Sequence, residues 1–110
     1  MVNQVHLCGT IGKTQIGKID DLEMARFTVA PEFIYRIDKE GTFDETDWYP
    51  CVALLSDKIP DLTIFVEKCT VDLQGRLIFG RFKDSEEEEP RWKMYVKVYE
   101  ARILWRPGDK

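Results

Sequence analysis

The chain has 110 residues, of which 44% are hydrophobic, 33% are charged and 12% are aromatic. This is enough for one domain with a real core, and the aromatic content excludes an intrinsically disordered chain. The 16 basic and 20 acidic residues give a net charge of −4, which disfavours binding to duplex DNA by bulk charge alone. A membrane-spanning helix needs about 18 consecutive apolar residues, and no stretch of the sequence approaches this length. Residues 1–9 lack the basic and apolar regions of a secretory signal, so we expect a cytoplasmic protein.

Three segments with strand-like patterns occupy the first half of the chain. Residues 2–11 are rich in apolar side chains and end at Gly12, as a first strand would. Residues 24–30 alternate, with Phe27 on one face and Arg26 and Thr28 on the other. Residues 38–44 are polar and predict a hairpin tip. A third strand is predicted over residues 46–55.

The spacing of apolar residues changes after the third strand. Four of them fall at positions i, i+3, i+4 and i+7 of one helical stripe: Leu62, Phe65, Val66 and Cys69. Ser56 or Asp57 is placed to cap the start of this helix, and Pro60 suits its first turn. The sequence therefore predicts one helix of about two to three turns between the third and fourth strands.

A period of two returns in residues 71–83, which predict the fourth strand. Its inward face is expected to continue as far as Leu77 and Phe79. Gly75 and Gly80 are expected at bulges or bends, where a strongly coiled strand requires a missing side chain.

Residues 91–105 predict a long final strand, after a solvated loop at Glu86–Glu89. Four residues share one of its faces: Trp92, Met94, Val96 and Val98. Five strands with glycine corners fit a small closed barrel better than a flat sheet, which would leave long apolar edges. The fold expected is therefore all-β, a five-stranded barrel over residues 1–106 with one short helix and a short tail, 107–110.

Residues for catalysis or metal binding are scarce. The cysteines Cys8, Cys51 and Cys69 are widely spaced and form no CxxC pair, so we expect three small core residues rather than a disulfide framework or zinc site. The single histidine, His6, leaves a Cys–His nucleophilic pair only as a formal alternative. We therefore expect no enzymatic activity, no metal and no cofactor.

Aromatic and basic residues interleave at two predicted hairpins. Residues 81–83 (Arg-Phe-Lys) and 91–93 (Arg-Trp-Lys) flank the glutamate loop, while Tyr35 and Trp48 lie near the hairpin around Gly41. Single-stranded nucleic acid binds such surfaces, because bases stack on flat side chains and cations contact the phosphates. The alternative is that these aromatics are ordinary core or edge residues of a sheet.

Four segments resemble bacterial single-stranded DNA-binding proteins in their order and spacing. MVNQV and GTIGK, in residues 1–13, are similar to the family opening MVNKVILVGNLGK, and RFTVA (26–30) is similar to NFSLAT. TDW (46–48) and LQGRL (73–77) match the family's TEW and YIEGRL. The resemblance covers about residues 1–105. It implies an OB fold, the oligonucleotide/oligosaccharide-binding barrel, usually in a homotetramer that coats single-stranded DNA in replication, repair and recombination.

The resemblance also implies which residues contact DNA. The family's base-stacking positions keep a ring at Tyr35, Trp48 and Phe82 and lose one at Leu54. The interleaved basic residues of the second half of the chain, rather than the resemblance, supply the expected phosphate contacts: Arg76, Arg81, Lys83, Arg91 and Lys93. The partners expected are single-stranded DNA, further copies of the chain in a dimer or tetramer, and replication or repair proteins, with no membrane.

Two departures from the family keep alternatives open. A family histidine that helps to hold subunits together is Tyr49 here, followed by Pro50, and the acidic–hydrophobic tip of the family is not found after Trp105. A primosome-like OB dimer that binds both DNA and a protein is therefore one alternative. The other is an acidic OB module that binds proteins without DNA, which the net charge, Leu54 and the glutamate run favour.

Overall fold

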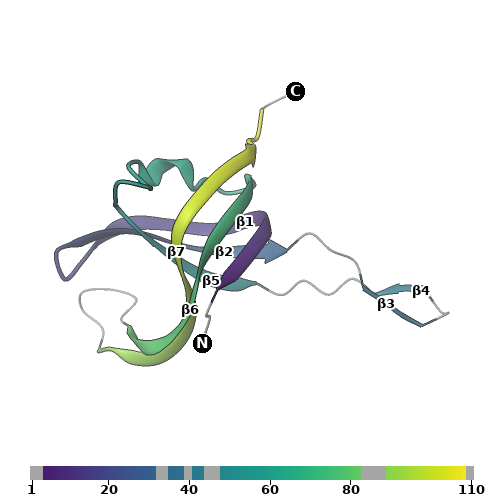
Figure 1. The fold of residues 1–110 in the computed structure, drawn as a ribbon, viewed down its shortest axis with the longest axis horizontal. Helices are drawn as coiled ribbons and strands as arrows, with labels where there is room; N and C mark the ends of the chain where they lie inside the picture. The colour runs from purple at the N-terminus through teal and green to yellow at the C-terminus, as the bar shows by residue number, and fades with distance from the viewer. Residues whose placement is uncertain (1–3, 32–34, 39–40, 44–47, 83–88, 109–110) are drawn as a thin grey trace.

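Five strands close a barrel in this computed structural model, which describes residues 4–31, 35–38, 41–43, 48–82 and 89–108. Around the barrel they are β1 (Val5–Ile19), β2 (Leu22–Pro31), β5 (Tyr49–Leu54), β7 (Arg91–Trp105) and β6 (Thr70–Phe82) (Figure 1). The expected all-β, five-stranded barrel is confirmed. Two short strands, β3 (Tyr35–Asp38) and β4 (Gly41–Phe43), pair as a separate hairpin around the predicted tip. Within the described ranges, no helix is long and apolar enough to span a membrane.

Strand β1 is longer than the sequence predicts and serves two neighbours. Its first part pairs with β6, from Val5↔Gly75 to Thr10↔Thr70, and a register shift between Ile11 and Thr14 bends the strand before it continues along β2. A two-residue turn at Asp20 and Asp21 then reverses the chain, and both residues adopt positive φ, 52° and 65°. Such turns require this left-handed backbone, which Asp tolerates better than most residues.

The core fills the barrel with apolar side chains from every barrel strand and from the segment after β5. The rings of Phe27 and Phe65 stack with centroids 4.6 Å apart. Around them lie Ile11, Val29, Cys51, Ile59, Cys69, Val71, Leu73, Val96 and Val98, all of them buried. Burial raises the pKa of the Cys51 thiol to about 12. Two of the three expected core cysteines are therefore confirmed, whereas Cys8 is exposed, because it follows inward Leu7 on a strand of period two.

The predicted helix is wrong. The segment contains only a 3₁₀ turn, η1 (Leu62–Ile64), whose N-cap is Asp61 rather than Ser56 or Asp57. Two hydrogen bonds from Thr63 to the Asp61 carboxylate lower its pKa. The β-branched residues Thr63, Ile64 and Val66 are poor helix formers, and the chain must turn at Lys68, with φ of 71°, to bond with Ile11. Burial still follows the pattern at Leu62, Phe65 and Cys69, while Val66 is exposed.

The inward orientation predicted for the end of β6 is also wrong, although Trp92, Met94, Val96 and Val98 share one face of β7 as expected. Val71 and Leu73 are buried, but Leu77 and Phe79 are 42% and 64% exposed, and Trp92 and Met94 opposite them are 64% and 54% exposed. Strand β6 pairs with β1 only as far as Gly75, and β7 pairs with β5 only from Val96 onward. Beyond these points the β6–β7 hairpin leaves the barrel, so nothing in the described chain covers its apolar face (Figure 1).

The two glycines of β6 behave differently. A register shift lies between Gln74 and Gly75, and a Cβ atom at Gly75 would come within 2.3 Å of the Lys97 carbonyl oxygen, so the bulge expected there is confirmed. Gly80 pairs with Lys93 without a register shift. The loop after β6 falls in residues 83–88, outside the described residues, and Glu89 at its end is exposed.

Candidate nucleic-acid interface

Trp48, directly before β5, lies on the outer surface of the barrel and is half-exposed. Its ring crosses β1 at Gly12, where an added Cβ atom would come within 2.6 Å of Trp48 Cζ3. A hollow of about 540 Å³ opens beside the ring, lined also by Lys13, Thr28 and Lys68. Glycine at position 12 thus lets an aromatic ring lie on the strand with cations next to it.

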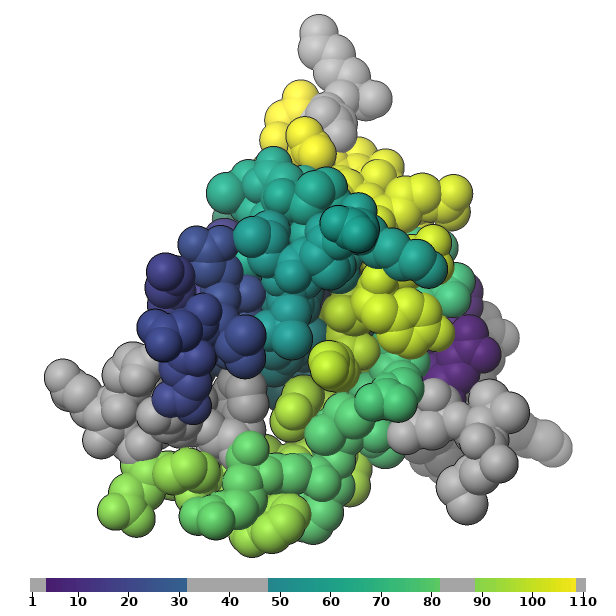
Figure 2. Space-filling model, turned by 60° about the vertical axis from the view of Figure 1, so that its left-hand side comes forward, coloured from purple at the N-terminus to yellow at the C-terminus, as the bar shows by residue number. Residues whose placement is uncertain are grey.

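A second hollow, of about 680 Å³, continues from the first across β2, β5 and β7. The two share Lys13, Thr28 and Glu67 in their linings, so together they form one groove, which we call the β2–β5 groove. The second part is lined by Gln15, Arg26, Pro50, Val52, Lys93, Met94 and Tyr95, among others. In Figure 2, β2 (blue) and β5 (teal) lie above the β6–β7 hairpin (green), which forms a ledge along the lower edge of this face.

The β2–β5 groove is basic although the chain is acidic. Among the residues that the structure describes, four cations line it, namely Lys13, Arg26, Lys68 and Lys93, against one carboxylate, Glu67. Arg26 Nη2 donates a hydrogen bond to Gln15 Oε1 at 2.6 Å, which fixes the guanidinium on this side of β2. Rings stand at both ends of the groove, Trp48 at one and the half-buried Tyr95 at the other. Such a surface can accept a flexible polyanion with flat apolar groups.

The cations predicted to contact phosphates divide between the two faces of the β6–β7 hairpin. The register pairs Arg76 with Lys97, Gly80 with Lys93 and Ile78 with Tyr95. Because side chains alternate along a strand, Arg76, Arg91 and Lys93 share one face with Tyr95 and Lys97. This face continues the groove, and we call it the basic face. Arg81 pairs with Trp92 and lies on the opposite face, while Lys83 is outside the described residues.

Of the three predicted stacking residues, Trp48 is the one whose side chain the structure describes. Tyr35 pairs with Phe43 in the β3–β4 hairpin, and Phe82 pairs with Arg91 at the end of β6. Their side chains lie outside the described part of the chain, so their stacking role stays a prediction. Leu54, where the family ring is lost, packs half-buried against Ile19, Met24 and Val52 beneath the β1–β2 hairpin.

Sequence reasoning missed five residues of this surface: Lys13, Arg26, Lys68, Tyr95 and Lys97. Arg26 was recoverable, because the alternation of β2 already places it opposite the core residue Phe27. Lys97 and Tyr95 follow from the period of β7 in the same way. Lys13 and Lys68 carry no such signal, since a bulge in β1 and a left-handed turn bring them to the groove.

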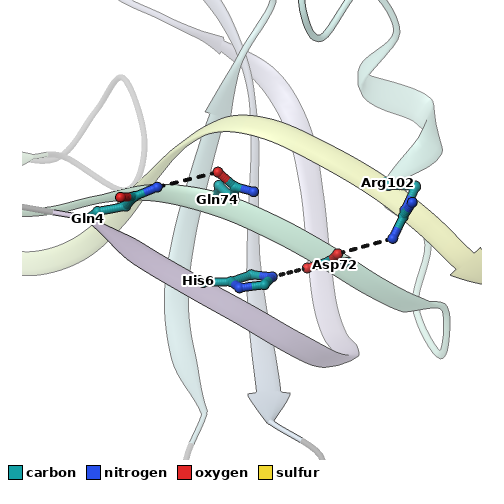
Figure 3. Close-up of polar contacts among 5 residues, drawn as sticks. All are labelled: Gln4, His6, Asp72, Gln74 and Arg102. Atoms are coloured by element: carbon teal, nitrogen blue, oxygen red, sulfur yellow. Dashed lines mark hydrogen bonds and ion pairs between the residues drawn. The ribbon is translucent and has the colours of Figure 1, made fainter.

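The outer surface of β1, β6 and β7 carries a polar cluster of different character (Figure 3). His6 Nε2 and Arg102 Nη2 both point to the Asp72 carboxylate, the latter at 3.4 Å, and Gln4 bonds with Gln74. His6 thus pairs with a carboxylate rather than with a cysteine. Among the described residues, no group of histidine, cysteine and carboxylate side chains is arranged to hold a metal ion. The charges here are balanced, so this surface offers little to a polyanion.

A solved structure with the same architecture is that of the Plasmodium falciparum SSB in complex with ssDNA. It superposes with a TM-score of 0.68 at 18% sequence identity, over 96% of this chain and 96% of that chain. The chain has the OB fold. No protein-family model and no curated protein matches the sequence. At this identity the similarity establishes the architecture, and the function must be argued from the groove.

Proposed function

We propose that this OB-fold protein binds single-stranded DNA with little sequence preference. The observation that carries the proposal is the β2–β5 groove, which joins the half-exposed ring of Trp48 to a row of cations in a chain of net charge −4. The complex of the structurally similar Plasmodium falciparum SSB with ssDNA supports it. Roles in replication, repair or recombination and a cytoplasmic location belong to the same proposal.

Each residue type in the groove has a role that its position favours. Bases stack on Trp48, and the resemblance to the single-stranded DNA-binding family adds Tyr35 and Phe82 as stacking rings. Lys13, Arg26, Lys68 and Lys93 contact phosphates along the groove, and Arg76 and Arg91 extend this row on the basic face. Stacking and phosphate contacts do not depend on base identity, so binding by these groups tolerates any sequence.

The competing function, an acidic OB module that binds proteins only, is less consistent with the charge of the groove. Such a module needs no row of lysines beside an exposed tryptophan. A primosome-like dimer that binds DNA and a protein remains compatible with the groove, because its DNA site would use the same residues.

Fluorescence anisotropy with labelled oligo-dT at low salt tests the proposal. The protein should bind, and Trp48→Ala should weaken binding by about ten- to a hundredfold, because one base–aromatic stack contributes about 1–3 kcal/mol. Trp48 is half-exposed and lies outside the core, so the variant should stay folded, which a thermal melt checks. Leu22→Ala, which removes another half-exposed apolar side chain far from the groove, is the matched control. Absence of oligo-dT binding by the unmodified protein refutes the proposal.

We further propose that the protein acts as a homo-oligomer, a dimer or a tetramer. Three apolar side chains near the end of β7 support this, since Tyr99, Leu104 and Trp105 are 36%, 48% and 42% exposed. Exposed apolar side chains on one strand are typical of an interface when a partner covers them. Light scattering at micromolar concentration should give a multiple of the chain mass of 12.9 kDa, whereas a monomer mass refutes the proposal.

A further inference from the structure

The β6–β7 hairpin has a second face, opposite the basic face, and of its four large apolar side chains only Met94 lines the groove. Leu77, Phe79, Trp92 and Met94 project from it, and each is between 42% and 64% exposed. The rings of Phe79 and Trp92 stack on each other, with centroids 5.5 Å apart and planes inclined by 26°. We call this surface the aromatic face. Two stacked rings that are each nearly two thirds exposed form a rigid apolar platform on a projecting ribbon.

The charge of the hairpin indicates what can cover the aromatic face. Its two strands, residues 76–82 and 91–97, contain five cations and no carboxylate: Arg76, Arg81, Arg91, Lys93 and Lys97. Packing a second copy of the same ribbon on this face would bring the two Arg81 guanidinium groups onto one apolar interface, which is unfavourable. A polyanion with flat apolar groups satisfies both the rings and the cations. Arg81, the register partner of Trp92, lies on the aromatic face itself.

The aromatic face is also continuous with the β2–β5 groove. Lys93, Met94 and Tyr95 all line the groove at the point where β7 leaves the barrel. Lys93 and Tyr95 belong to the basic face, whereas Met94 belongs to the aromatic face, as the partner of Phe79. A single DNA strand that leaves the groove along β7 can therefore pass around the edge of the β6–β7 hairpin and stay in contact with the protein.

We propose that Phe79 and Trp92 form a second base-stacking platform for the same single strand, on the face of the hairpin opposite Lys93 and Tyr95. This inference rests on the proposed function and deepens it. Bases leaving the groove stack on the Phe79–Trp92 pair, Met94 and Leu77 flank them, and Arg81 contacts a phosphate. The platform acts only on strands long enough to fill the groove first, so its contribution depends on oligonucleotide length.

Oligo-dT of about 6 and about 16 nucleotides, close to the range of site sizes for one OB fold, separates the two sites. Phe79→Thr and Trp92→Thr keep strand propensity while removing the rings. Each should weaken binding of the longer oligonucleotide by about tenfold and leave the shorter one unchanged, because one stacking contact is lost. Trp92→Phe should restore most of the affinity. Trp48→Ala, in the groove, should weaken both lengths, and Leu22→Ala, an exposed apolar residue that lines neither part of the groove, should weaken neither.

The outcomes distinguish this inference from the function on which it rests. If the unmodified protein binds neither oligonucleotide, the proposed function fails. If it binds both, and the two threonine variants bind both equally well, the function stands and the platform is refuted. A threonine variant that binds DNA normally but changes its sedimentation coefficient identifies the aromatic face as a protein contact, which also overturns the inference.

Discussion

At residue 12 the absence of a side chain decides where an aromatic ring can lie. A Cβ atom there would come within 2.6 Å of both Trp48 Cζ3 and Thr28 Oγ1, which are ends of side chains. At Gly9, by contrast, an added Cβ atom would meet the Ala30 carbonyl oxygen at 2.1 Å, and backbone cannot move aside so easily. The two glycines therefore serve different purposes, one for the groove and one for the fold.

Substitutions at these glycines should separate binding from stability. Gly12→Ala is expected to displace the Trp48 ring and weaken oligo-dT binding by about tenfold, the loss of one stacking contact, while the protein stays folded. Gly9→Ala should instead destabilise the fold by several kcal/mol, of the order found when backbone strain is forced on a core. Gly17→Ala, with nothing within 4 Å of the added atom, is the control for both. Binding curves and thermal melts of the three variants check this, and normal binding by Gly12→Ala would contradict it.

The three thiols should differ in reactivity. Cys8 is exposed, whereas Cys51 and Cys69 are buried, and burial raises the pKa of Cys51 to about 12. The thiolate is the reactive form, so Cys51 stays protonated and inert across the neutral range. Iodoacetamide at pH 8 should label one equivalent in the native protein and three after denaturation, as counted by mass spectrometry. Cys8→Ser should abolish the native label, and a label that persists in this variant would contradict the assignment.

At the scale of elements, the turn between β1 and β2 holds strain that a single substitution can release. Asp21 adopts φ of 65°, a conformation that glycine accepts without steric cost. Asp21→Gly should raise the free energy of unfolding by about 0.5–1 kcal/mol, because the left-handed strain of a non-glycine residue disappears. Urea denaturation measures the change. Asp57→Gly, at an exposed position outside the residues with positive φ, should instead be neutral or slightly destabilising.

The alternation of side chains along each strand could be predicted from the sequence. Whether another part of the chain covers a given strand face could not. The period of two correctly groups Leu77 and Phe79 with the core residue Leu73, and it fails only because β1 stops pairing at Gly75. Strand ends are set by partners far away in the chain, which local patterns do not report. For the same reason the helical stripe identified buried residues such as Phe65 without giving their backbone conformation.

The site was less predictable than the fold. Trp48 and Lys93 could be predicted because aromatic and basic residues interleave in the sequence, and the family resemblance also indicates Trp48. The groove, however, takes Lys13, Arg26 and Lys68 from three separate segments. Only the closed barrel brings these segments together. Sequence reasoning placed most cations on the β6–β7 hairpin, and the structure adds a row on the barrel itself.

For the whole molecule, binding should depend on salt in proportion to the cations engaged. With about four or five phosphates contacted, the slope of log affinity against log salt should be about −3, since each contributes about −0.7 for a single strand. Lys13→Gln removes one groove cation and should flatten the slope by about 0.7. Arg102→Gln removes the same charge from the polar cluster and should leave the slope unchanged. Equal effects of the two substitutions would mean that net charge, rather than the groove, drives binding.

The barrel closes through its shortest ladder. Strands β5 and β7 share three register pairs, from Cys51↔Val96 to Ala53↔Val98, whereas β6 and β7 share thirteen. Local openings concentrate where few backbone hydrogen bonds hold, so the amide hydrogens that bond across the β5–β7 ladder should exchange faster than those of the β2–β5 ladder, which has six register pairs. The groove lies across this seam, with Pro50 and Val52 on one side and Lys93 and Tyr95 on the other. A bound DNA strand therefore contacts both β5 and β7, and binding in the groove should slow amide hydrogen exchange in the β5–β7 ladder.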